Sequence, residues 1–185
     1  MIEHGRERNE AMVKDGSGLV TRPESPPDVD DIRAVNIAAF ETSEEADLVD
    51  ALRGSSAWID GLSWVATTAA GDVVGHALLT RCTVGESAGL CLAPCAVDPR
   101  YQGQGIGSAV IEAALEAARV QGGDFVVVLG HPGYYPRFGF RRASDYGIGL
   151  SIDVPADALM VMTLNDDASV PAGTVCYAEP FGIPC

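Results

Sequence analysis

The chain has 185 residues, and its 26 acidic and 12 basic side chains give a formal net charge of −14 at pH 7. A chain of this length can bury enough apolar surface for one domain without disulfide or metal cross-links. The 47% share of hydrophobic residues excludes a disordered or fibrous protein. Because an acidic protein repels nucleic acids and anionic lipids, we expect neither as a main partner. The same charge favours cationic ligands such as amines, or it serves solubility alone.

The sequence predicts a cytoplasmic protein with no membrane segment and no metal. Its first residues lack the apolar core of a signal peptide, and no later run approaches the ~20 apolar residues of a membrane span. Five cysteines without a Cys-x-x-Cys pair indicate free thiols in a reducing compartment. His76 with Cys82, Cys91 and Cys95 matches no common zinc-ligand spacing, so we expect core packing instead.

Pattern and composition divide the chain into three parts. Residues 1–17 are charged and aperiodic, which predicts a flexible N-terminal arm. Residues 18–164 carry the strong helix and strand patterns and form the predicted α/β domain. Residues 165–185 are a C-terminal extension that we expect to pack on the same domain. Its alternation from Thr174 to Tyr177 predicts an edge strand or a segment wrapped over the surface.

The first half of the domain shows two helix patterns followed by a hairpin. The turn residues Ala-Ala-Gly-Asp at 69–72, between two strand-like runs, are typical of a hairpin. The predicted elements are a strand at Leu19–Arg22, a helix from the N-cap Asp28 to Phe40, a helix from Ser43 to Gly54, and strands at Leu62–Thr68 and Val73–Val84.

The second half indicates a parallel crossover, in which a strand passes through a loop and a helix to a continuously apolar strand. Pro94 interrupts the first of these strands and cannot donate to a ladder, so it marks a bulge or an unpaired stretch. The predicted elements are a strand at Gly89–Val97, a helix with the apolar side Val110, Ile111, Ala114, Leu115 and Ala118 that ends at Gly122-Gly123, and strands at Phe125–Leu129 and Ala158–Leu164.

Three glycines, Gly103, Gly105 and Gly107, stand where the first strand passes into this helix. Glycine permits positive φ and lets a ligand approach the backbone closely. The unpaired amides of the first helical turn, with the positive end of the helix dipole, then form an anion site. No acidic residue occurs from Pro99 to Ile111. The pattern predicts a pyrophosphate-binding loop, and the alternative is a glycine-rich turn that serves tight packing.

Two common nucleotide motifs are excluded. A Walker A loop needs a lysine followed by Ser or Thr after its last glycine, but Gly107 is followed by Ser108 and Ala109. The dinucleotide fingerprint needs another glycine spacing and a carboxylate after the next strand, which here ends in Leu129-Gly130. We therefore expect a different phosphate-bearing cofactor.

Two motifs resemble the landmarks of the GCN5-related N-acetyltransferases, the GNAT family. Gln102-Gly-Gln-Gly-Ile-Gly107 is similar to the family's Gln/Arg-x-x-Gly-x-Gly/Ala signature, and Ala96-Val-Asp-Pro99 precedes it. Tyr135 stands five residues before Phe140 of a Gly-Phe pair, as in the second family landmark. With the strands around them, the two motifs cover roughly residues 62–140, in the family's order and separation.

The resemblance implies a three-layer α/β fold, with a strongly twisted mixed β-sheet, flanking helices and splayed parallel central strands at 89–97 and 125–129. It implies acetyl-CoA as cosubstrate, no metal, and direct transfer of the acetyl group to a primary amine of a small molecule or peptide. Polyamines, aminoglycoside-like compounds and amino-terminal peptides are the acceptors considered. A homodimer is a further expectation. The alternative function is a non-catalytic acyl-CoA-binding sensor or interaction module.

The resemblance also implies site residues. Tyr135 is the expected general acid that protonates the departing CoA thiolate, and Tyr134 is its substitute. His131 and Glu86 are candidates for the general base, with ordinary loop roles as the alternatives. Arg137, Arg141 and Arg142 either meet the 3′-phosphate of CoA or are surface charges. The expected cofactor-binding residues are Cys95, Ala96, Val97, Gln102, Gly103, Gln104, Gly105, Ile106, Gly107, Ser108 and His131.

Overall fold

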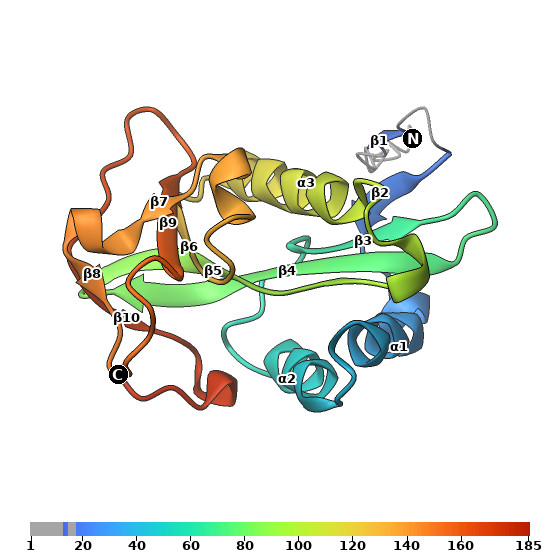
Figure 1. The fold of residues 1–185 in the computed structure, drawn as a ribbon, viewed down its shortest axis with the longest axis horizontal. Helices are drawn as coiled ribbons and strands as arrows, with labels where there is room; N and C mark the ends of the chain where they lie inside the picture. The colour runs from blue at the N-terminus through green and yellow to red at the C-terminus, as the bar shows by residue number, and fades with distance from the viewer. Residues whose placement is uncertain (1–12, 15–17) are drawn as a thin grey trace, which may run out of the picture.

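The computed structural model describes residues 13–14 and 18–185, so most of the predicted arm at 1–17 lies outside the described residues. A central sheet lies between two layers of helices (Figure 1). Helix α3 (Ile106–Val120) covers one face, and α1 (Val29–Phe40) and α2 (Glu44–Arg53) cover the other. This arrangement confirms the predicted three-layer α/β fold.

The sheet is mixed, as predicted. Its strands follow the order β1–β2–β3–β4–β5–β6–β9–β7, and along this path only β5 and β6 are parallel. The described strands are β1 (Val13–Lys14), β2 (Val20–Pro23), β3 (Ser63–Thr67), β4 (Val73–Val84), β5 (Ser87–Val97), β6 (Phe125–Leu129), β7 (Arg141–Arg142), β8 (Ile148–Gly149), β9 (Leu159–Thr163) and β10 (Gly173–Cys176). The two-residue strands were not predicted, because so short a segment carries no periodicity.

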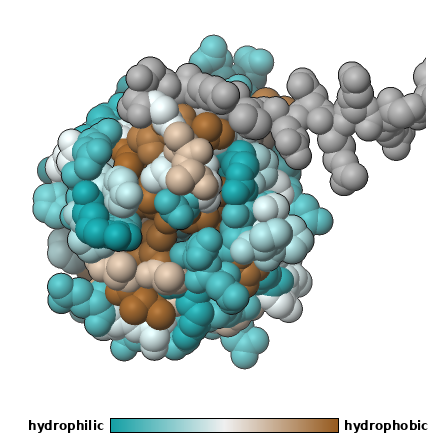
Figure 2. All heavy atoms as spheres, turned by 90° about the vertical axis from the view of Figure 1, so that its right-hand side faces the viewer, coloured by the Kyte–Doolittle hydropathy of each residue, from teal (hydrophilic) through white to brown (hydrophobic). Residues whose placement is uncertain are grey.

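Apolar layers on both faces of the sheet hold the helices. The predicted apolar side of α3 is buried against the sheet, and Gly122, with φ +81°, follows the end of this helix as expected. On the other face, Ile32 and Val35 of α1 pack with Val49 and Leu52 of α2. Figure 2 views the right-hand end of Figure 1 and shows apolar residues in the middle of that end, with hydrophilic residues around them.

Asp28 is the N-cap residue of α1, as predicted, but its side chain makes no capping hydrogen bond to that helix. Its carboxylate instead accepts hydrogen bonds from the Ser25 amide at 2.7 Å and from Arg22 at 2.6 and 2.7 Å. The Arg22 guanidinium, more than any other contact, lowers the pKa of Asp28 to about 2. The carboxylate therefore fixes the turn η1 (Pro26–Asp28) against β2.

The two parallel strands separate soon after they meet. Ladder pairs join Leu90 to Val126 and Cys91 to Val127, and no pair joins β5 to β6 beyond these. β5 nevertheless continues along β4 as far as Val97, with a bulge opposite the segment that contains Pro94. One edge of β5 is thus left open from residue 92 onward, which confirms both the predicted splay and the predicted interruption.

The C-terminal segment adds a strand to the sheet. This agrees with the first of the two expectations for it, a strand and not a segment wrapped over the surface. β10 pairs with the second half of β4, with Val175 opposite Val84, and it also runs parallel to β8. The following turn η5 (Glu179–Phe181) contacts α2. The C-terminal residues therefore lie on the same face of the sheet as α1 and α2 (Figure 1).

A buried polar chain links both ring nitrogens of His76 to neighbouring elements. Asn36 Nδ2 lies 3.2 Å from His76 Nδ1. Because that amide nitrogen can only donate, Nδ1 accepts and the proton resides on Nε2. Nε2 donates to Ser63 Oγ at 3.0 Å, and Ser63 in turn donates to Glu24, which also pairs with Arg53. His76 is thus a buried neutral imidazole that joins α1 to β3 and β4.

Acid should destabilise the protein through this histidine. Burial, with the charge of Arg53 as a smaller cause, lowers the pKa of His76 from 6.5 to about 3. Below pH 6.5 the histidine therefore binds a proton in the unfolded chain but not in the folded chain. The free energy of unfolding consequently decreases as the pH is lowered. By pH 5 the loss is about 2 kcal/mol. Urea unfolding at pH 7 and pH 5 should show a markedly smaller loss for His76→Gln; equal losses would contradict this account.

Candidate active site

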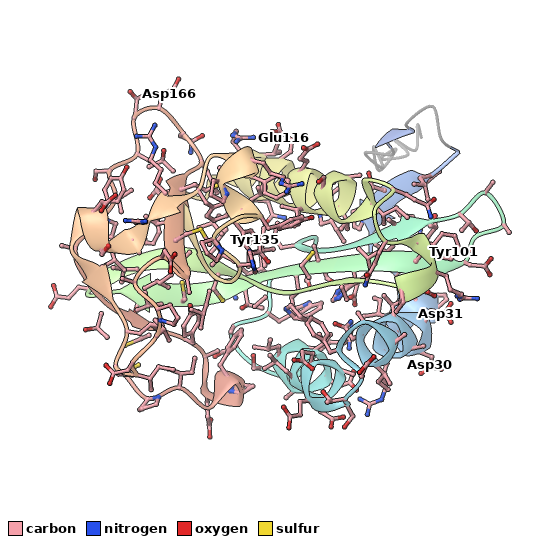
Figure 3. The ribbon with its side chains drawn as sticks, viewed as in Figure 1. Asp30, Asp31, Tyr101, Glu116, Tyr135 and Asp166 are labelled. Atoms are coloured by element: carbon pink, nitrogen blue, oxygen red, sulfur yellow. The ribbon has the colours of Figure 1, made fainter. Side chains whose placement is uncertain are left out.

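A cavity of about 540 Å³ opens where β5 and β6 separate and α3 begins. In Figure 3, Tyr135 lies over the middle of the sheet, while Tyr101 lies toward the end at which α3 begins. The lining residues are Ala39, Phe40, Cys95, Val97, Tyr101, Gln102, Gly103, Gly105, Gly107, Ser108, His131, Tyr134, Tyr135 and Arg137. We call this space the cofactor cavity.

The start of α3 presents free backbone donors to the cofactor cavity. Gly103 and Gly105 adopt φ of +75° and +84°, a conformation that favours glycine. A Cβ at either position would meet no described atom within 4 Å, so their backbone faces open space. In the described part of the chain, no side chain caps the helix at Gly105. The first-turn amides and the positive helix end therefore stay available to an anion.

Side chains hold the loop before α3 in place. The Asp98 carboxylate accepts from the Arg100 amide at 2.9 Å and from its guanidinium at 2.7 Å. The hydrogen bonds from Arg100 lower the pKa of Asp98, so this carboxylate stays ionised near neutral pH. Gln102 Nε2 donates to the Val97 carbonyl at 3.1 Å. These contacts tie the loop to the end of β5 and fix where the free amides point.

Tyr135 opens the short turn η3 (Tyr135–Phe138) and packs directly on Gly130. Its ring contacts Tyr134 edge-on at 5.2 Å between centroids and Phe140 at 5.8 Å. Burial raises the pKa of the Tyr135 phenol, which therefore remains protonated across the neutral range. The ring lines the cofactor cavity and also a second cavity beside it. Tyr135 thus lies at the boundary between the two cavities, where its phenol can donate a proton to a bound group.

Tyr134 is placed differently from its neighbour. The Arg137 guanidinium lies 4.4 Å from the centroid of the Tyr134 ring. A Cβ at Gly107 would lie 2.8 Å from the Tyr134 hydroxyl, so this ring reaches the start of α3. Tyr134 lines the cofactor cavity but not the second one. It is therefore positioned as part of the cofactor cavity's wall, away from the boundary that Tyr135 occupies.

Cys95 of β5 also lies at the boundary between the two cavities and lines both of them. Burial raises the pKa of its thiol to about 12. The thiolate is the nucleophilic form of cysteine, and the raised pKa keeps Cys95 in the thiol form near neutral pH. Cys95 thus resembles a packing residue more than an attacking group.

The structure gathers most of the predicted site residues and separates others. Ala96 and Ile106 are buried in the apolar core, so only their main chain can serve a ligand. The Gln104 side chain is exposed and turns back to the Arg100 carbonyl. Of the three arginines considered for the 3′-phosphate of CoA, Arg137 lines the cavity. Arg141 and Arg142 are exposed on β7 and do not line it, which agrees with the alternative that these two are surface charges.

Glu86, a candidate base, lies in the exposed turn between β4 and β5 and lines neither cavity. The sequence argument missed Ala39, Phe40 and Tyr101. Phe40 carried a weak signal, since it is a large apolar residue at the end of a helix. Its position across the sheet from the glycine loop follows only from the folded structure.

Within residues 13–14 and 18–185, no group of three or more His, Cys, Asp or Glu side chains is placed to hold a metal ion. In the same part of the chain, no helix combines the length and apolar character needed to cross a membrane.

The three-layer fold, with its splayed parallel strand pair and its uncapped, glycine-rich helix start, fits the acyltransferase class that the sequence resemblance implies. Comparison with known proteins gives the same class. The profile of the Acetyltransferase (GNAT) domain matches residues 60–142. The uncharacterized N-acetyltransferase YjhQ of Escherichia coli K12 is 38% identical over 161 residues, which cover 83% of this chain and 88% of YjhQ. The chain belongs to the GNAT family of acetyltransferases.

Solved structures agree in fold and sequence. The N-acetyltransferase YhbS of Escherichia coli, crystallised with CoA, superimposes with a TM-score of 0.83 at 30% identity and covers 97% of this chain and 96% of YhbS. A GNAT acetyltransferase from Brucella melitensis, crystallised with acetyl-CoA, gives a TM-score of 0.73 at 32% identity, covering 88% of this chain and 97% of that one. These comparisons confirm the family resemblance seen in the sequence.

Proposed function

We propose that this protein transfers the acetyl group of acetyl-CoA directly to a primary amine of a small molecule or peptide. One observation carries the proposal: a single cavity brings together the free amides at the start of α3, the open edge of β5 and the protonated phenol of Tyr135. The CoA and acetyl-CoA complexes of the YhbS and Brucella relatives support it.

The residues of the cofactor cavity fit acetyl-CoA. The amides of Gly105, Gly107 and Ser108 would hold its diphosphate, because the positive end of α3 and the open space at the glycines suit such an anion. The open edge of β5 from Cys95 to Val97 would pair with the pantetheine arm. His131 and Arg137 line the same cavity and would contact the cofactor there. The arrangement calls for no metal.

Bound acetyl-CoA supplies the acetyl thioester. The protein's own groups would stabilise the developing negative charge and donate the proton to the leaving group. Main-chain donors on the open edge of β5 would stabilise negative charge that develops on the thioester oxygen. Tyr135, which lies at the boundary between the two cavities, would give its proton to the departing sulfur. Because the raised pKa of Cys95 disfavours attack by its thiol, the amine would attack directly, in its neutral form after the ammonium proton has passed to solvent. The C–N bond forms as the C–S bond breaks, and the proton that the nitrogen then loses passes to solvent, from which Tyr135 regains the proton that it gave to sulfur.

Two assays test the proposal. Thermal unfolding should shift upward with acetyl-CoA and CoA but not with ATP or NAD; a ligand at one hundred times its Kd adds about 2.7 kcal/mol of stability. With acetyl-CoA, release of free thiol should then depend on an added amine. Saturable binding without thiol release from any amine would overturn the enzymatic proposal and favour an acyl-CoA-binding module.

The glycine loop gives a sharper prediction for cofactor binding. Gly105→Ala should weaken acetyl-CoA binding about tenfold or more, since a methyl group would stand in the open space before the amides. Gly122→Ala is the matched control, because Gly122 lies beyond the other end of α3 with φ +81° and equally open surroundings. Calorimetric titration should find normal affinity in the control. Equal affinity in both variants would contradict the proposed diphosphate site.

A further inference from the structure

A second cavity of about 350 Å³ lies beside the cofactor cavity. The two share Phe40, Cys95 and Tyr135 as a common wall. We call the second space the acceptor cavity. A group bound there can reach the boundary at Tyr135, where the proposed function places the thioester. At this volume, near the lower limit for small-molecule sites, it suits a compact ligand.

The acceptor cavity is built from segments far apart in the chain. Leu48 of α2 lies on one side, and Tyr177, Phe181 and Ile183 of the C-terminal segment lie on another. The contact between α2 and η5 holds these two sides together. The C-terminal segment thus completes the cavity, and without it the boundary at Tyr135 would face solvent.

The lining of the acceptor cavity selects a chemical class. Its side chains are mainly apolar, and Glu45 is the sole charged one among the described residues that line it. Phe40 and Leu129 also line it, and each leaves 37% of its surface exposed. A ligand in the cavity could bury this apolar surface. A polyamine or an aminoglycoside would have to bury several polar groups against these walls, which is unfavourable. An amine on an apolar body would bury apolar surface instead.

One charged group of the wall suits such a ligand. Glu45 lies in the first turn of α2, where its carboxylate accepts from Thr42 Oγ1 at 3.1 Å and can attract an ammonium ion. Tyr177 is 8% exposed and packs with Phe181 at 5.1 Å between ring centroids, so it contributes apolar ring surface to the wall.

We infer that the acceptor cavity binds the acceptor, and that this acceptor is a small primary monoamine carried on an aromatic or aliphatic body. The inference rests on the proposed acetyl transfer and names its substrate class. Glu45 attracts the ammonium group, and the apolar wall formed by Leu48, Phe181 and Ile183 holds the body. Glu45 is a positioning residue and takes no part in the proton transfer assigned to Tyr135.

The first test compares amines at saturating acetyl-CoA. Phenethylamine and hexylamine should give kcat/KM values about tenfold or more above those of spermidine, kanamycin and a short peptide. A preference for spermidine, kanamycin or the peptide would overturn the inference and leave the acetyltransferase proposal standing. No thiol release with any amine, despite acetyl-CoA binding, would overturn both. Calorimetric titration of phenethylamine into the protein with CoA gives a readout independent of turnover, and absence of binding would also overturn the inference.

The second test uses adjacent glutamates of α2. Glu45→Gln should raise KM for phenethylamine about threefold to tenfold, with kcat and acetyl-CoA affinity nearly unchanged. Glu44→Gln is the matched control, because it removes the same charge from the same helical turn but lines neither cavity. Ile183→Asn should also raise this KM, whereas Ile152→Asn, at an exposed position outside the cavity, should not. Equal KM values within both pairs would overturn the inference.

Discussion

Replacing Tyr135 by phenylalanine is expected to lower kcat by about 10² to 10⁴-fold, the usual contribution of a general acid. The ring, its contact with Gly130 and the aromatic cluster all remain in this variant, so only the proton donor is lost. Acetyl-CoA affinity should change little, because the proposed diphosphate site lies at the start of α3. Steady-state kinetics with phenethylamine and calorimetry with CoA measure the two effects separately.

Tyr134→Phe is the matched control for this prediction. Tyr134 carries the same phenol one residue earlier, but it contacts Arg137 and the start of α3 and lines only the cofactor cavity. Its loss should affect acetyl-CoA binding more than kcat. If Tyr134→Phe abolished turnover and Tyr135→Phe did not, the acid would be Tyr134, and the assignment by position at the boundary would be wrong.

The layers of the fold could be predicted from the sequence because their signals are local. The apolar side of α3 and the continuous apolar run of β6 each specify an element and its buried face. The glycine loop could also be predicted, because positive φ and free amides at the start of a helix depend only on neighbouring residues. Pro94 indicated the interruption in β5 because a residue without an N–H cannot continue a ladder.

The acceptor cavity could not be predicted in the same way. No pattern in the sequence distinguishes Glu45 from the other acidic residues of its helix, and only the packing of η5 against α2 brings it to the same cavity as the C-terminal segment. The partner of β10 depended on long-range pairing with β4 and β8, for which alternation in one strand gives no register. The N-cap position of Asp28 was predicted, but the pairing of its carboxylate with Arg22 was not, because that contact depends on the folded turn.

Substitution of Gly130 by alanine should lower kcat about 10- to 100-fold by displacing the Tyr135 ring, a shift of the kind that overpacking forces on neighbouring groups. A Cβ at Gly130 would lie 2.3 Å from Cε2 of Tyr135, closer than atoms can approach. The Gly130 amide donates to the Ala158 carbonyl at 2.9 Å, which holds the backbone against β9. The ring must therefore move, and its hydroxyl leaves the boundary between the two cavities.

Gly149→Ala in β8 is the matched control for Gly130→Ala, because its Cβ would meet no described atom within 4 Å. It should retain normal kinetics. The double variant Gly130→Ala with Tyr135→Phe should be no slower than Tyr135→Phe alone, since both changes remove the same proton donor from its place. Rate losses that multiply would instead show that Gly130 acts on the reaction independently of Tyr135. In that case the contact between Gly130 and the Tyr135 ring would not position the general acid.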